Sequence, residues 1–209
     1  MTATSTIIRK KAAPPANSVV TAERYAEGID SYAGWMAAIE KNTENFERHY
    51  NEWQPDMGDA AAVKKLVQQY GVKAMVIGED FCPDVWRGVP VMAHIHELTG
   101  MEVRYFMRDL NKDIMAEFLK DGEFESVPAI VFYDGNHRYL GHWIERADLA
   151  NDQMPLLRKI MEGVERDTPE YAEARAKYQA MTWEYAEGWR DAQLTEVRAL
   201  LEEALEGVI

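Results

Sequence analysis

The segment GEDFCPDVW (residues 78–86) contains the only cysteine of this 209-residue chain, Cys82, and the fold can be worked out from its surroundings. The preceding run KAMVIGE (73–79) is apolar and contains β-branched residues, which predicts a buried strand. Apolar residues at helical spacing follow over 84–99, and Gly100 ends that pattern. Cys82 is therefore expected at the turn where a strand leads into the N-terminus of a helix.

This position has opposing effects on the thiol of Cys82. The free N–H groups and the dipole of a helix N-terminus stabilise a thiolate and lower the pKa of a cysteine. The carboxylates of Glu79, Asp80 and Asp84 oppose this effect by charge repulsion. Arg87 is the one cation close by in sequence. The sequence therefore leaves the direction of the pKa shift open.

The elements that follow predict a mixed sheet. MEVRYFMRD (101–109) alternates like a strand, and 128–145 predicts two strands around the turn dipeptide Asp134-Gly135. A short helix is expected over 111–122, between these strands. Alternating helices and strands imply a central sheet with helices on its faces. The first two strands should be parallel, and the last two antiparallel.

Helical patterns flank this core on both sides. One apolar stripe predicts a helix over 21–41, and further helices are expected over 59–70 and 155–166. A long helix should open at Thr168-Pro169 and run to about residue 206. Its apolar stripe resembles a coiled coil with a slip in phase near Trp189. This stripe indicates packing either against the rest of the chain or in a homodimer.

These residues and their spacing resemble the thioredoxin superfamily. Phe81 followed by CPDV stands where that family has an aromatic residue and its Cys-x-x-Cys motif. Pro90 lies eight residues after the cysteine, at the position of the family's helix-bending proline. Val127-Pro128 corresponds to the family's cis-proline and the aliphatic residue before it. The resemblance covers residues 57–146 and is greatest for members with a Cys-Pro-Asp-Cys motif, here reduced to Cys-Pro-Asp-Val.

The resemblance implies an α/β fold, with a mixed four-stranded sheet flanked by helices. It also divides the chain into four expected segments. They are a flexible N-terminal arm (1–18), an N-terminal helical extension (19–56), a thioredoxin-like domain (57–150) and a C-terminal helical extension (151–209).

The resemblance further implies that Cys82 is the nucleophile, beside a proline that presents its backbone to an extended substrate. The substrate-binding residues expected from it are Phe81, Pro83, Asp84, Val85, Trp86, Val127 and Pro128. An ordinary trans proline that opens an edge strand is the alternative for Pro128. Val85 stands where the family has its resolving cysteine, and Val76 where it has a buried acid. A fast dithiol reductase is therefore not expected.

Three functions remain open. In the first, Cys82 performs monothiol exchange with a protein disulfide or a low-molecular-weight thiol, and an external thiol resolves the mixed disulfide. In the second, the chain is a redox-inactive binding or assembly module that acts through its helical extensions. In the third, Cys82 senses oxidation by forming a sulfenic acid. A buried, inert Cys82 would remove the first and the third, so the sequence leaves open whether the chain is an enzyme.

Composition excludes other classes of partner. The formal net charge of −13 argues against nucleic acid and against an anionic membrane surface. A single cysteine permits no intrachain disulfide, which fits a reducing compartment, so a cytoplasmic location is expected. The two histidines of HIH (94–96) diverge on a helix and cannot serve one ion. No dinucleotide or phosphate-binding motif is present, and neither a metal nor a cofactor is expected.

Overall fold

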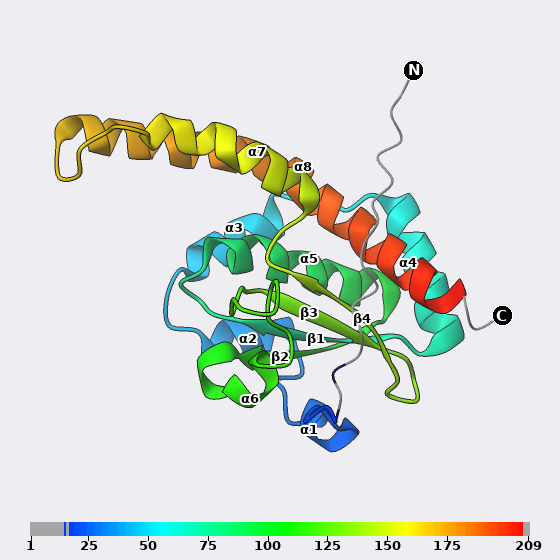
Figure 1. Cartoon of the computed structure of the whole chain (residues 1–209). Coiled ribbons are helices and arrows are strands. Elements are labelled where there is room, and N and C mark those ends of the chain that lie inside the picture. The colour runs from blue at the N-terminus through cyan, green and yellow to red at the C-terminus, as the bar shows by residue number, and fades with distance from the viewer. Residues whose placement is uncertain (1–14, 16, 207–209) are drawn as a thin grey trace.

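The computed structural model describes residue 15 and residues 17–206, so most of the predicted flexible arm (1–18) lies outside the described residues. A four-stranded sheet with strand order β2-β1-β3-β4 forms the centre (Figure 1). The elements are α1 (Ala22–Ala26), α2 (Tyr32–Ala38), α3 (Thr43–Asn51), α4 (Met57–Tyr70), β1 (Lys73–Gly78), α5 (Pro83–Thr99), β2 (Glu102–Met107), the 3₁₀ turn η1 (Arg108–Leu110), α6 (Lys112–Met115), β3 (Ala129–Tyr133), β4 (Tyr139–Ile144), α7 (Asp148–Arg158), the 3₁₀ turn η2 (Lys159–Met161) and α8 (Pro169–Glu206).

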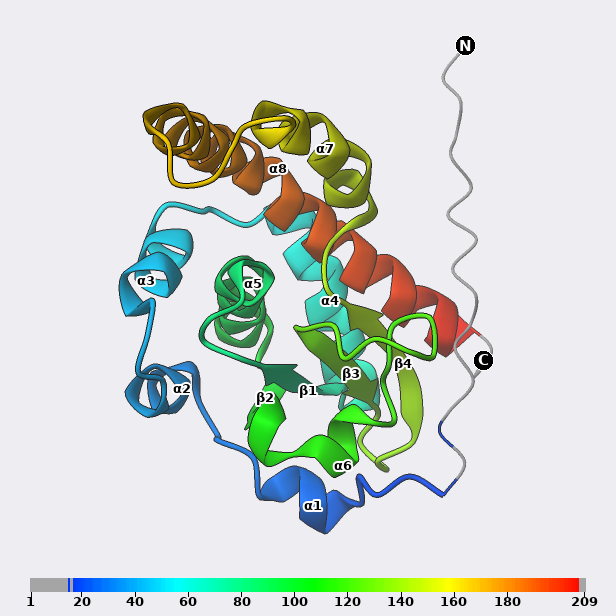
Figure 2. The same cartoon turned by 60° about the vertical axis from the view of Figure 1, so that its left-hand side comes forward.

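The pairing of the strands confirms the predicted mixed sheet. β1 pairs with β2 in parallel, whereas β3 is antiparallel to both β1 and β4. Every residue of β3 is buried, because helices cover both faces of the sheet. α4, α5 and α8 lie on one face, and α1 and α6 lie on the other (Figure 2). This arrangement places the N-terminus of α5 at the end of the central strand β1.

The single helix predicted over 21–41 is wrong. The chain forms two short helices there, and Ile29 between them pairs with Tyr105 of β2 through two N–H···O bonds of 2.9 Å. Gly28 packs so closely on Phe106 that a Cβ would lie 2.5 Å from the ring. These tertiary contacts outweigh the helix preference of this segment. The bridge between Ile29 and Tyr105 also covers the outer edge of β2, which would otherwise be unpaired.

The N-terminal helices share one hydrophobic core with the sheet. Trp35 of α2 is fully buried, and its ring centroid lies 6.2 Å from that of Phe46 and 6.0 Å from that of Tyr105. Trp53, just after α3, is also fully buried and donates its indole N–H to Asp191 of α8 at 2.8 Å. Segment 19–56 therefore contacts both the sheet and the last helix.

The long helix α8 has 38 residues and packs differently along its length. Its C-terminal half contributes to the main core through Leu194, Val197, Leu201 and Leu205. Its N-terminal half forms a hairpin with α7 that extends beyond the sheet (Figure 1). A second apolar cluster joins the two helices of the hairpin and contains Ala150, Met154, Leu157 and Trp189.

The apolar stripe of α8 therefore packs largely against other parts of the same chain, which was one of the two predictions for it. The homodimer stays a prediction. No helix in the described part of the chain is long and apolar enough to cross a membrane.

Candidate functional site

Cys82 occupies the N-cap position of α5, as the sequence predicts, and is half-buried. Its Sγ lies 3.5 Å from the carbonyl oxygen of Val127, to which the thiol can donate. The peptide bond between Val127 and Pro128 is cis. A Cβ at Gly88 of α5 would lie 3.0 Å from Cγ of Pro128, so the absence of a side chain there lets the proline approach the helix. The fold thus brings together the three residues Cys82, Val127 and Pro128 from two distant segments.

Burial decides the question that the sequence left open, because it raises the pKa of the Cys82 thiol. The backbone N–H groups of Val85 and Asp84 and the charge of Arg87 favour the thiolate, and the charge of Asp84 opposes it. The hydrogen bond to Val127 also favours the protonated thiol. Cys82 is therefore a weaker acid than a free cysteine, although it sits at a helix N-terminus.

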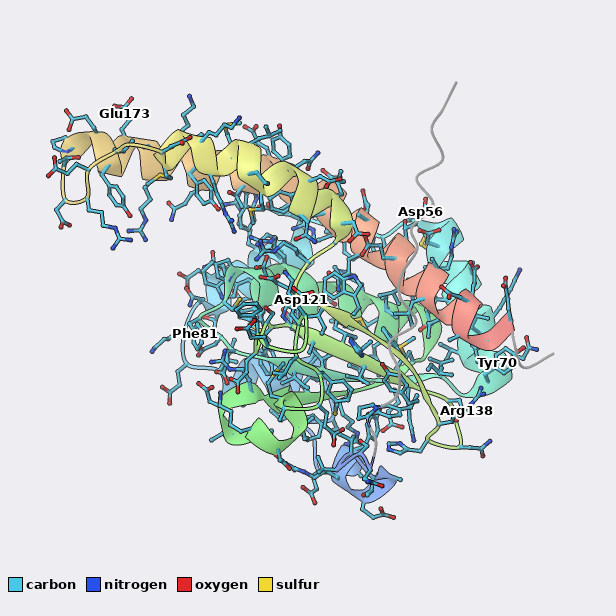
Figure 3. The ribbon with its side chains drawn as sticks, in the orientation of Figure 1. Asp56, Tyr70, Phe81, Asp121, Arg138 and Glu173 are labelled. Atoms are coloured by element: carbon cyan, nitrogen blue, oxygen red, sulfur yellow. The ribbon has the colours of Figure 1, made fainter. Side chains whose placement is uncertain are left out.

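Phe81 and Trp86 flank Cys82 in different ways. Phe81 is 50% exposed and lies at the outer edge of the domain in Figure 3, with the guanidinium of Arg108 5.4 Å from its ring centroid. Trp86 is half-buried, and its indole N–H donates to the carbonyl oxygen of Asp80 at 2.6 Å. Phe81 thus offers an apolar surface to a partner, whereas Trp86 holds the turn in shape.

The turn before Cys82 is also fixed to the N-terminal segment. One carboxylate oxygen of Asp80 accepts the backbone N–H groups of Glu40 and Lys41 at 3.0 and 2.9 Å. Glu79 points elsewhere and accepts the N–H of Asp109 at 2.7 Å. The two adjacent carboxylates therefore serve different structural contacts, as expected for neighbours that point to opposite sides.

Four of the expected substrate-binding residues are buried, namely Asp84, Val85, Val127 and Pro128. Val85 is 0% exposed and lies against Gly78, whose added Cβ would be 2.9 Å from Cγ1 of Val85. Asp84 is 8% exposed and pairs with Arg87 and, at 2.6 Å, with Arg146. Neither side chain is available at the surface to a substrate. Pro83, by contrast, is exposed.

The histidines of HIH have structural partners. Nε2 of His94 lies 2.9 Å from the carbonyl oxygen of Tyr50, and Nδ1 of His96 lies 2.7 Å from that of Met101. Among the residues that the structure describes, no group of three His, Cys, Asp or Glu side chains is placed to hold a metal ion.

A large groove next to the first turn of α5 has no counterpart in the sequence-based predictions. Its volume is about 1090 Å³, and its walls come from α3, α5, α7 and α8. Pro83, Asp84 and Trp86 form the end near Cys82. No local motif marks it, because its residues are spread from Asn42 to Glu184.

Comparison with known proteins gives one family and two similar solved structures. The sequence model of the family described as thioredoxin matches residues 30–161. A protein of unknown function from Pseudomonas aeruginosa has a similar structure, with a TM-score of 0.59, 18% identity and coverage of 88% of this chain and 99% of that chain. An HIV epitope scaffold is similar with a TM-score of 0.55, 17% identity and coverage of 87% and 97% respectively. No curated protein matches the sequence.

Proposed function

Because the chain belongs to the thioredoxin family, we propose that it exchanges thiols and disulfides through Cys82 by a monothiol route. The observation that carries this proposal is the position of Cys82 at the N-terminus of α5, with Sγ 3.5 Å from the carbonyl oxygen of Val127. An extended substrate segment can bind at the surface next to the buried Pro128 and reach the half-buried sulfur of Cys82. The half-exposed ring of Phe81 provides apolar surface next to it.

The reaction requires two thiol–disulfide exchanges. The Cys82 thiolate attacks one sulfur of a disulfide, a Cys82 mixed disulfide forms, and the other sulfur leaves as a thiolate. A second thiol from solution then attacks the mixed disulfide and releases the Cys82 thiolate. The partner is a protein disulfide or a low-molecular-weight thiol, in a reducing compartment such as the cytoplasm.

The raised pKa of Cys82 makes the mixed disulfide long-lived. A thiol of high pKa is a poor leaving group, so an external thiol displaces it slowly. Val85 supplies no second sulfur that could displace the partner from within the chain. We therefore expect Cys82 to retain a bound thiol rather than to turn over rapidly.

The pH dependence of the first exchange tests the proposal. We expect the rate of mixed-disulfide formation with glutathione disulfide, followed by intact-mass spectrometry, to rise about tenfold per pH unit from neutral pH. The inflection should lie above the value of about 8.5 that a free cysteine shows, because the folded chain disfavours the thiolate. Cys82→Ser provides the blank, since it removes the sole thiol.

One outcome would oppose this proposal, and a second would oppose only the raised pKa of Cys82. Reaction only after denaturation would mean that the thiol is inert in the folded chain, and the binding or assembly module would then be the remaining hypothesis. An inflection well below that of a free cysteine would mean that the helix N-terminus dominates over burial at this site.

Introducing a second thiol should speed up release of the partner. In Val85→Cys the new side chain is smaller than valine, so it fits the buried space beside Gly78. We expect the preformed mixed disulfide of this variant to release its thiol at least about tenfold faster, because attack becomes intramolecular. Val85→Ser, of similar size but without a thiol, controls for loss of packing. Equal release from both variants would show that position 85 cannot reach Cys82.

A further inference from the structure

The groove beside the first turn of α5 is not used by the proposed exchange at Cys82. It lies where the hairpin of α7 and α8 passes α3 and the N-terminal end of α5 (Figures 1 and 2). Glu173, labelled in Figure 3, marks the far end of this hairpin. The hairpin thus forms one wall of the groove, and the thioredoxin-like body forms the other.

The lining of this groove is strongly basic, although the whole chain carries a net charge of −13. Its two carboxylates are Asp84 and Glu184. Its five arginines are Arg48, Arg87, Arg146, Arg158 and Arg175. A concentration of arginines in an acidic protein indicates a local positive field, which attracts anions into a partly enclosed site.

Two of these five positive charges have no ion-pair partner among the described residues. Asp84 is shared between Arg87 and Arg146. Arg146 also pairs with Glu145, and Arg48 pairs with Glu52 at 2.8 Å. Arg158 and Arg175 are exposed, and neither forms an ion pair with a carboxylate of the described residues. The outer wall of the groove therefore presents two free guanidinium groups, whose planar N–H donors suit carboxylate and phosphate oxygens.

Arg190 provides an independent indication behind this wall. It is 4% exposed, contacts His49, and forms no direct ion pair within the described part of the chain, although the charges of Glu187, Asp191 and Glu52 act on it. Its Nε is buried without a hydrogen-bond partner. Together with Arg87 and Arg146, it borders a small cavity that adjoins the groove. A buried guanidinium without a direct ion pair is unfavourable, and an anion bound nearby would offset part of its cost.

His49 does not relieve this excess of positive charge. Burial, followed by the charges of Arg190, Arg87 and Arg48, lowers the pKa of His49 to about 2. The imidazole is therefore neutral at physiological pH. Its low pKa results first from burial and then from the three neighbouring arginines.

The groove also has apolar walls. Its aromatic and sulfur-containing lining residues are Trp86, Met154, Met161, Tyr171, Tyr178 and Trp183. The Trp183 ring stacks on His49 with centroids 4.1 Å apart, and the Arg48 guanidinium lies 3.7 Å from its centroid. Such surfaces favour a ring or another apolar group of a ligand.

We propose that this groove binds a small molecule in which two or more carboxylate or phosphate groups are attached to an aromatic or apolar body. Its volume of about 1090 Å³ is sufficient for such a ligand. A long polyanion such as nucleic acid is disfavoured by the overall charge of −13. This binding is independent of thiol exchange and should survive Cys82→Ser.

Isothermal titration calorimetry of the full chain with matched probes tests the ligand class. Adenosine diphosphate and phenylsuccinate provide the phosphate and carboxylate arms, and adenosine and the diamide of phenylsuccinate are their uncharged counterparts. We expect at least one anionic probe to bind about tenfold or more tightly than its counterpart, and to weaken as added salt screens the charges. The probe that binds more tightly, adenosine diphosphate or phenylsuccinate, shows whether the groove prefers phosphate or carboxylate.

Two double variants locate the binding. Arg158→Gln with Arg175→Gln should weaken binding of the anionic probe by about tenfold, because two unpaired donors are removed. Lys64→Gln with Lys65→Gln changes the net charge equally, on exposed positions of α4 outside the groove, and should change the Kd by less than about twofold. Circular dichroism and thermal unfolding check that both variants are folded.

The proposal would be overturned by any of three results. Uncharged probes could bind as well as the charged ones, the two double variants could lose affinity equally, or none of the four probes could bind at millimolar concentration.

Discussion

Asp84→Asn is expected to lower the free energy of unfolding by about 3 to 5 kcal/mol, because it removes one partner from a buried ionic cluster. Asp84 is 8% exposed and pairs with both Arg87 and Arg146. Without its charge, Arg87 loses the ion pair that the described structure gives it. Among the described residues, Arg146 then keeps Glu145 as its ion-pair partner, and Glu145 also pairs with Lys120. Urea unfolding, with the m-value checked for two-state behaviour, measures the loss.

Asp109→Asn is the matched control for this substitution. The side chain of Asp109 is 51% exposed and pairs with Arg108 and Lys112 at 2.9 Å each, so its ion pairs are screened by water. Loss of the Asp109 charge should lower the free energy of unfolding by about 0 to 1 kcal/mol. If Asp84→Asn were no more destabilising than this control, the buried cluster would be unimportant for stability and the account of Asp84 given above would fail.

Trp35→Ala should also cost about 3 to 5 kcal/mol of unfolding free energy, because it leaves a large cavity in the core. Trp35 is 0% exposed and packs between Phe46 and Tyr105. The expected loss is large because α2 and the sheet share one core. Trp35 precedes residues 57–146, which carry the motifs, but it lies within residues 30–161 that the family's sequence model matches. Chemical unfolding followed by circular dichroism gives the value.

Two further variants make this prediction specific. Trp35→Phe should cost less than Trp35→Ala, because a ring remains and the indole N–H has no hydrogen-bond partner within the described residues. Leu110→Ala, at an 82% exposed position, should change stability by less than about 0.5 kcal/mol. A cost for Trp35→Ala as small as that of Leu110→Ala would mean that the N-terminal helices are a separable extension.

The order of the core elements could be predicted from the sequence because their signals are local. The apolar run of β1, the glycines after α4 and α5, and the Asp134-Gly135 turn each specify one element within a few residues. The break between α1 and α2 could not be predicted. It depends on the contact of Gly28 with Phe106, which is formed only when the sheet is in place.

In the candidate site, too, features with a local sequence signal could be predicted, and features that depend on distant segments could not. The position of Cys82 before α5 could be predicted from local pattern, and the proximity of Val127 and Pro128 from the resemblance alone. The raised pKa of Cys82 could not be predicted, because it depends on burial by segments distant in sequence. The basic groove could not be predicted either, since its five arginines lie between Arg48 and Arg175 and converge only in the folded chain.

The position of α8 has a consequence for how the protein is made. The indole N–H of Trp53 donates a hydrogen bond to Asp191, 138 residues later in the chain. Asp59 of α4 accepts hydrogen bonds from both Thr195 and Arg198 of α8. The main core also needs Leu194, Val197, Leu201 and Leu205. A nascent chain on the ribosome can form the strands of the sheet before α8 is translated, but until then α4 and α5 expose the apolar surface that α8 covers. The protein should therefore depend on chaperones during translation, and interrupted synthesis before α8 should yield an aggregation-prone fragment.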